Sequence, residues 1–170
     1  MPATRDDLFA KLADLGIETA THEHDAVFTV VEAKGLRGEI SGGHTKNLFL
    51  KDKRGRLWLV VCLEDRVVDL KALRRCLGAA KSLSFGKPDL LRQVLGIEPG
   101  LVTPFAAMND AAGRVTVVLD SGMLACEPLN FHPLENTATT QIGAQDLIRF
   151  LAATGHEPRI LDLENPAVGA

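Results

Sequence analysis

The sequence is poor in aromatic residues and has no long apolar run. Its 170 residues include no tyrosine, one tryptophan and seven phenylalanines, so few rings are available to stack on nucleic-acid bases. No apolar stretch reaches the roughly 18 residues that a membrane-spanning helix needs. The amino terminus also lacks the apolar core of a signal peptide. We therefore expect a cytoplasmic protein with no membrane partner.

Cysteine is scarce as well. Cys62, Cys76 and Cys126 are widely spaced and form no CxxC pair, which favours reduced thiols over a disulfide framework. His22 and His24 share one face of a predicted strand, but the sequence offers no third ligand near them. We expect neither a metal nor another cofactor.

The formal net charge is −3. A protein that coats nucleic acid without specificity needs many phosphate contacts, so this balance argues against DNA as a partner. It leaves room for a protein that holds the end of an RNA through a few groups. The sequence also lacks GxGxxG, GxxxxGK[ST], HExxH and GxSxG, which removes the commonest nucleotide-binding, metalloprotease and serine-hydrolase signatures.

Apolar periodicity and capping residues predict alternating helices and strands. The expected helices cover residues 4–15, 29–36, 69–77, 88–95 and 144–153. The expected strands cover residues 17–24, 45–51, 56–63, 83–85, 114–120, 123–127, 136–142 and 158–163. This pattern predicts one α/β domain over residues 1–170, with a mixed, mostly antiparallel, partly closed sheet surrounded by helices and a frayed tail over 164–170.

One stretch combines a flexible turn with a fixed cation. Gly42 and Gly43 precede an alternating run that begins at Thr45, Lys46 and Asn47. The strand would hold the Lys46 ammonium in place, and the glycines would let another molecule's backbone approach. A solvated lysine at the start of a strand is the ordinary alternative.

Other polar residues complete a candidate binding set. Asn130 and His132 precede a strand rich in hydroxyl groups, and the loop over 96–106 holds two glycines and two prolines that fix its backbone. Lysine supplies positive charge to a phosphate or a developing oxyanion, and asparagine offers both donor and acceptor. Such a set suits hydrolysis of an activated ester more than formation of a covalent intermediate.

Three motifs occur in order along residues 4–163. They are Lys46-Asn47-Leu48-Phe49-Leu50, then Gly100-Leu101-Val102-Thr103-Pro104, and finally Asn130-Phe131-His132-Pro133-Leu134 with Asn136-Thr137-Ala138-Thr139-Thr140. With these motifs the chain resembles the YbaK/prolyl-tRNA editing domain family. Within it, the chain is most similar to the free-standing alanyl-tRNA(Pro) deacylases (the PrdX or ProXp-ala type). The late GxRG loop typical of the Cys-tRNA(Pro) deacylases is absent.

The resemblance implies a trans-editing hydrolase that cleaves mischarged Ala-tRNA(Pro) to free alanine and tRNA(Pro). It implies that Lys46 is essential and contacts the acyl-adenosine end, with Asn47 and His132 orienting that end. Thr45, Asn130 and the loop from Gly100 to Pro104, with Leu101, Val102 and Thr103 between, are then substrate-binding residues. The implied partners are the acceptor end of tRNA(Pro) and, as candidates, prolyl-tRNA synthetase or an elongation factor.

Three alternatives stay open. The first is a deacylase of the same family that acts on Cys-tRNA(Pro) or another aminoacyl-tRNA. The second is a module that binds tRNA or a synthetase without catalysis. The third is a metal hydrolase, which would need convergence of His22, His24, His44 and His132.

Overall fold

A mixed sheet runs through the molecule in the order β1-β7-β6-β2-β3-β5-β8, with β4 paired to β2. The computed structural model describes residues 1–25 and 40–164. The strands are β1 (Thr19–Glu23), β2 (Gly43–Lys51), β3 (Leu57–Leu63), β4 (Ser84–Phe85), β5 (Val115–Asp120), β6 (Leu129–Phe131), β7 (Ala138–Ile142) and β8 (Arg159–Leu161). The helices are α1 (Arg5–Asp14), α3 (Leu70–Leu77), α4 (Pro88–Leu95) and α5 (Ala144–Ala153), with 3-10 helices η1 (Pro104–Asn109) and η2 (Met123–Ala125).

The predicted fold class is confirmed. The described residues form one α/β domain with a mixed sheet flanked by helices. The sheet is open rather than partly closed as expected, with β1 and β8 at its edges. Within the described ranges, four pairings are antiparallel (β1–β7, β2–β3, β2–β4 and β6–β7) and three are parallel (β2–β6, β3–β5 and β5–β8). The predicted hairpin of residues 45–51 and 56–63 is present as β2 and β3.

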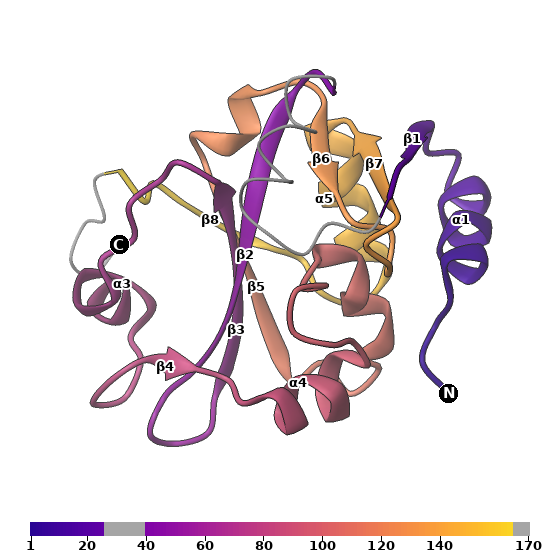
Figure 1. The fold of residues 1–170 in the computed structure, drawn as a ribbon. Helices are drawn as coiled ribbons and strands as arrows, with labels where there is room; N and C mark the ends of the chain where they lie inside the picture. Colours follow the sequence, from indigo (N-terminus) through magenta and orange to yellow (C-terminus); the bar gives the residue numbers. More distant parts are fainter. Residues whose placement is uncertain (26–39, 165–170) are drawn as a thin grey trace.

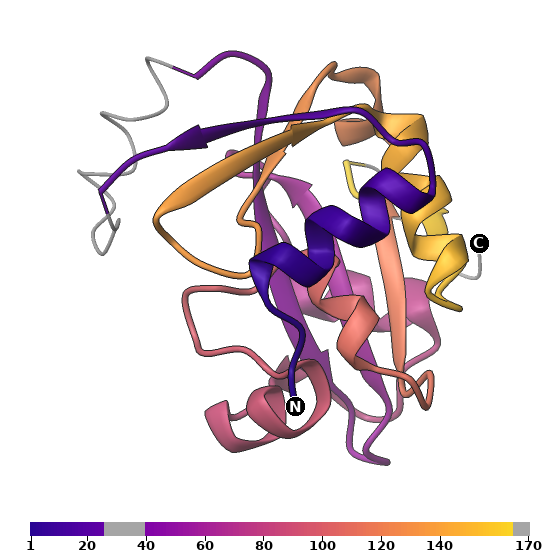
Figure 2. The same cartoon turned by 90° about the vertical axis from the view of Figure 1, so that its right-hand side faces the viewer.

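Helices cover the two faces of the sheet unequally. In Figure 1, α3 lies on one side of β2 and β3, whereas α1, α4, η1 and α5 lie on the other. Figure 2 shows α1 running across this second layer. The larger core cluster includes Leu8, Leu59 and Phe150 and lies under the α1 and α5 side, while the smaller one joins Trp58 and Cys62 to α3. The central strand β3 therefore has core on both faces.

Local capping signals explain where the helices begin and end. The Thr4 hydroxyl accepts a hydrogen bond from the Asp7 backbone N–H, and the Asp7 carboxylate accepts one from the Thr4 N–H, which makes a capping box on α1. The Asp69 carboxylate caps α3 by accepting from the backbone N–H groups of Lys71 and Ala72, and Gly78 ends the helix in the left-handed region at φ 71°.

Two predicted elements are wrong. Residues 123–127 do not pair with β5, whose partners are β3 and β8. They turn instead, because the Asp120 carboxylate accepts a hydrogen bond from the Gly122 N–H and a 3-10 turn follows. Pro104 opens a 3-10 helix where a loop was expected, with the Thr103 hydroxyl accepting from the Phe105 N–H at 3.3 Å. The helix predicted over 29–36 and the tail beyond residue 164 lie outside the described residues.

Gly42 sits where β2 enters the sheet. Its φ is +95°, and a Cβ there would lie 2.5 Å from the Pro128 carbonyl oxygen. That same carbonyl accepts a hydrogen bond from the Gly43 N–H at 2.8 Å. Only glycine fits this conformation and this contact together.

Candidate functional site

The first half of β2 carries the predicted site lysine. Thr45, Lys46 and Asn47 are half-buried. Neighbouring residues of a strand point to opposite faces, and Lys46 pairs with Cys62 whereas Asn47 pairs with Val61. Cys62 belongs to the core beside α3 and Val61 to the core beside α1 and α5. Lys46 and Asn47 therefore project from opposite faces of the sheet.

Lys46 has a defined hydrogen-bond acceptor. Its ammonium donates to the backbone carbonyl of Arg66, in the turn after β3. The Arg66 guanidinium in turn pairs with Asp120, whose side chain is fully buried, at 3.1 Å. Burial raises the pKa of the neighbouring Cys62 thiol to about 11, against the opposing influence of Lys46. The thiol is thus neutral at physiological pH, and Lys46, Arg66 and Asp120 are charged side chains near it.

Thr45 and Asn130 hold the start of β2 against β6. The Thr45 hydroxyl donates to the Asn130 carbonyl at 2.8 Å, and the Asn130 amide donates to the carbonyls of Ser41 and Gly43 at 3.0 and 3.1 Å. The side-chain oxygens of Asn130 and Asn47 are both buried and accept no hydrogen bond from the described part of the chain. A buried acceptor without a donor is costly, so these two oxygens are unusual among the buried polar atoms of the described chain.

His132 lies close to His24 and the start of β7. Its Nδ1 is 3.4 Å from the Ala138 carbonyl oxygen, while His24 Nε2 is 2.9 Å from the Thr139 hydroxyl. Burial, with a smaller contribution from His24, lowers the pKa of His132 below its ordinary value despite the Ala138 hydrogen bond. The neutral imidazole is therefore favoured, and with Nδ1 protonated it donates to that carbonyl.

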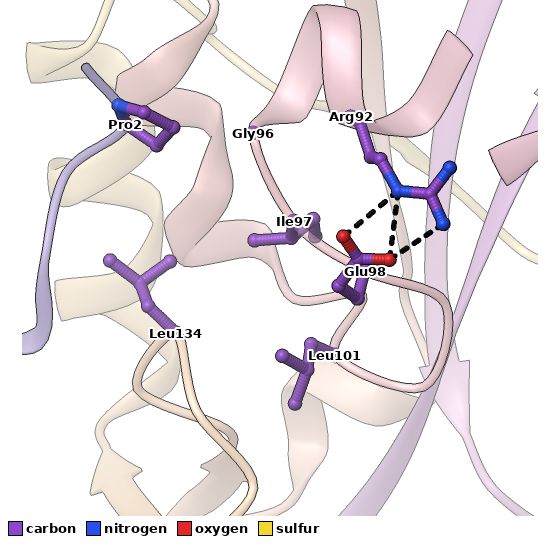
Figure 3. Close-up of a pocket in the computed structure, with 7 residues that line it drawn as sticks. All are labelled: Pro2, Arg92, Gly96, Ile97, Glu98, Leu101 and Leu134. Atoms are coloured by element: carbon purple, nitrogen blue, oxygen red, sulfur yellow. Dashed lines mark hydrogen bonds and ion pairs between the residues drawn. The ribbon is translucent and has the colours of Figure 1, made fainter. Parts of the chain in front are cut away.

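The Gly100–Pro104 loop lies on the α1 side of the sheet. Leu101 and Val102 pack against the larger core cluster, Thr103 and Pro104 are buried, and Gly100 adopts φ +91°. A cavity of about 270 Å³ lies beside this loop (Figure 3). Its lining residues are Pro2, Arg92, Gly96, Ile97, Glu98, Leu101 and Leu134.

Among the predicted site residues, Leu101 lines this cavity. Figure 3 shows Leu101 and Leu134 projecting from two different segments, with the ion pair between Arg92 and Glu98 on the side away from Pro2. The predicted set is thus divided. Asn47 and the loop lie on the α1 side, whereas Lys46 lies on the opposite face.

Sequence reasoning missed Arg66, Asp120 and His24 as neighbours of the predicted site. Arg66 and Asp120 are 54 residues apart, so no local spacing indicates their pairing. From the sequence, His24 is only a candidate metal ligand, whereas in the structure it is half-buried and its Nε2 lies 2.9 Å from the Thr139 hydroxyl. Within residues 1–25 and 40–164, no group of three or more His, Cys, Asp or Glu side chains is placed to hold a metal ion. The helices in those ranges are also too short or too polar to cross a membrane.

Comparison with known proteins identifies the class. The chain belongs to the aminoacyl-tRNA editing domain family, whose sequence profile matches residues 24–150. This confirms the resemblance carried by the three motifs.

Individual relatives extend along nearly the whole chain. A zebrafish (Danio rerio) protein named prolyl-tRNA synthetase associated domain-containing protein 1 is 41% identical over 162 residues, covering 94% of this chain and 88% of the relative. The prolyl-tRNA editing protein ProX of Acetoanaerobium sticklandii is 36% identical over 157 residues, covering 92% and 95%. A crystal structure described as a proposed trans-editing enzyme for prolyl tRNA synthetase matches the fold with TM-score 0.70 at 21% identity, covering 96% and 98%.

Proposed function

We propose that this protein is a trans-editing hydrolase that cleaves the ester of mischarged Ala-tRNA(Pro). The observation that carries the proposal is the likeness to the prolyl-tRNA editing protein ProX, which extends over 92% of this chain. The aminoacyl ester is already activated, so placing it beside water is most of the catalytic task. The reaction releases alanine and tRNA(Pro).

Lys46 is the cation of the proposed site. Lys46 is half-buried, and its ammonium donates to a neutral carbonyl rather than to a carboxylate, so its positive charge is available to a phosphate or to the oxyanion that develops on the ester carbonyl. His132, whose pKa is lowered by burial, acts as a neutral orienting group. The 2′-hydroxyl of the terminal ribose positions the attacking water, as the family resemblance implies, and this hydroxyl makes RNA a requirement.

Asn47 and the Gly100–Pro104 loop serve the amino-acid end. The Asn47 oxygen, buried and without a donor among the described residues, accepts a hydrogen bond from the substrate's ammonium group. Lys46 and Asn47 lie on opposite faces of β2. A substrate that contacts both residues must therefore pass over an edge of that strand. Within the described chain, this edge is paired with β6 at Gly43–His44 and with β4 at Leu50–Lys51, and no strand pairs with it between these points.

A second site is needed because a synthetase pocket sized for proline also admits alanine. A missing methylene changes binding by only about 1–3 kcal/mol. A smaller editing site excludes proline by size and admits alanine.

A deacylation panel tests the proposal. Purified protein is incubated with Ala-, Cys-, Ser- and Pro-tRNA(Pro), and loss of the labelled amino acid is followed over time. We expect rapid hydrolysis of Ala-tRNA(Pro) and none of Pro-tRNA(Pro) above the rate without protein. Preference for Cys-tRNA(Pro) would move the protein to the other deacylase branch. Hydrolysis of no substrate, with retained binding of tRNA, would favour a non-catalytic module.

A further inference from the structure

Three residues form a row across adjacent strands on the α3 face of the sheet. Lys46 pairs with Cys62, and Val61 pairs with Leu119, so the following residues Cys62 and Asp120 are neighbours on the same face. Cys62 and Asp120 are fully buried. The outer members, Lys46 and Asp120, are separated by two strand spacings, about 10 Å. Within the described residues no ion pair joins Lys46 to Asp120, and the cation paired with this carboxylate is Arg66.

Arg66 spans this separation with two different groups. Its guanidinium Nε donates to Asp120 Oδ2 at 3.1 Å, and its backbone carbonyl accepts from the Lys46 ammonium. The turn that carries Arg66 is closed by two further hydrogen bonds, from Arg66 N to the Leu63 carbonyl and from Glu64 N to the His44 carbonyl, both at 3.0 Å. The orientation of the Arg66 carbonyl is thus determined at the backbone and at the end of its side chain.

Asp120 is itself fixed. Its Oδ1 accepts from the Leu163 N–H at 3.1 Å and from the Gly122 N–H at 3.4 Å, which leaves Oδ2 for Arg66. A Cβ on Gly122 would lie 2.8 Å from Arg66 Nη2, so glycine leaves room for the guanidinium. A buried ion pair without other partners is weak evidence for stability. In this pair both carboxylate oxygens of Asp120 accept hydrogen bonds, and the Arg66 carbonyl accepts one from the lysine of the proposed site.

We infer that Arg66 is a positioning residue for Lys46, with Asp120 as its anchor. The pair holds the Arg66 carbonyl where it orients the Lys46 ammonium toward the substrate, and Arg66 does not itself contact the reacting ester. This inference rests on the proposed function, since it gives Lys46 its role.

Kinetic measurements on Arg66 variants test the inference. In Arg66→Met the backbone carbonyl that accepts from Lys46 remains, but the contact with Asp120 no longer fixes its position. A displacement of about 1 Å costs about 100-fold in rate. We expect this loss in kcat for Ala-tRNA(Pro), with KM unchanged within about twofold. Arg66→Lys keeps a cation for Asp120 and should recover part of the rate. Arg149→Met is the control for loss of an arginine ion pair away from Lys46: the Arg149 guanidinium, on α5, donates to the Asp146 carboxylate and to the Leu15 carbonyl.

A double-mutant cycle separates positioning from a general loss of structure. If Arg66 acts through Lys46, adding Arg66→Met to Lys46→Ala causes no further loss of rate, whereas independent roles are additive. Additive losses would overturn the inference, as would equal losses in Arg66→Met and Arg149→Met.

A second measurement does not depend on catalysis. The rate of reductive methylation of Lys46, followed by mass spectrometry, should rise several-fold in Arg66→Met and stay unchanged in Arg149→Met. An unchanged rate in Arg66→Met would overturn the inference even if the enzyme edits tRNA. A raised rate in a protein that hydrolyses no aminoacyl-tRNA would support the positioning contact and count against the proposed function alone.

Discussion

Two parts of the sheet are built from different residues. The apolar half comprises β3 and β5, where Leu59, Val60 and Val118 have no exposed surface. The polar half comprises β1, β6, β7 and β2 up to Asn47. Its side chains bond to one another, as in the contact of Thr21 with Thr140 at 2.9 Å and that of His22 with Gln141 at 3.0 Å. The apolar half stabilises the fold by burying apolar side chains. The polar half leaves polar atoms that a ligand can contact.

The largest expected effect is a loss of activity from a substitution in the polar half, with stability unchanged. Lys46→Ala should lower single-turnover deacylation of Ala-tRNA(Pro) by about 1000-fold, because a preorganised charge at the ester is lost. The free energy of unfolding in urea should change by less than about 0.5 kcal/mol, since the side chain is half-buried and outside the core. Lys51→Ala, at the far end of the same strand, is the control. Wild-type turnover in Lys46→Ala would remove Lys46 from the site.

The second effect is a loss of stability from a substitution in the apolar half, with activity unchanged. Leu59→Ala should lower the free energy of unfolding by about 3 kcal/mol, because Leu59 is fully buried and its removal leaves a cavity. Deacylation by the protein that remains folded should stay within about twofold of wild type. Thr116→Ala, at an exposed position of β5, is the matched control. A large loss of activity in folded Leu59→Ala would show that the halves are coupled.

The third effect concerns the β2–β3 turn, where the apolar half ends. Burial opposes ionisation of Asp52, but hydrogen bonds from Ala80, Arg56 and Arg54 outweigh it and lower its pKa from 3.8 to about 2. The ionised carboxylate therefore stabilises the fold above pH 3.8, and this stability is lost as the pH falls through about 2. Asp52→Ala should cost about 2 kcal/mol at pH 7, measured by urea unfolding. The difference from wild type should shrink between pH 4 and pH 2, and a constant difference would contradict this origin.

The smallest expected effect is on the pH dependence of stability, and it comes from His132 in the polar half. Because burial lowers its pKa in the folded state, the unfolded chain takes up a proton first as the pH falls below 6.5. Wild type should therefore lose stability on acidification from pH 7 to pH 5. His132→Gln should lose less, and urea midpoints at the two pH values measure the difference. A parallel fall in both proteins would mean that His132 is not neutral in the fold.

The sequence predicts best what local chemistry determines. The helix expected over 144–153 is α5 at the same bounds, and α3 (Leu70–Leu77) fills the range predicted for it, 69–77. Strand alternation alone also separates Lys46 from Asn47, whereas the resemblance implies that both act on the same end of the substrate. The strand predicted at 123–127 fails because an Asp-Ser-Gly turn outweighs the apolar pattern.

The site is less accessible from sequence than the fold. The resemblance indicates Lys46 and the Gly100–Pro104 loop, and family membership is established, while the roles of these residues stay predictions. The Arg66–Asp120 pair follows from parallel pairing of β3 and β5, which brings together residues that no spacing rule connects. The neutral state of His132 depends on burial by distant segments, so it too requires the fold.

Gly42 has a consequence for how the two halves relate. A residue with any side chain would press on the Pro128 carbonyl and disturb the bond that this carbonyl receives from Gly43. The register of β2 against β6 is therefore fixed at this point. Even a single methyl group at position 42 would force the backbone to shift where β2 meets β6, just ahead of Lys46.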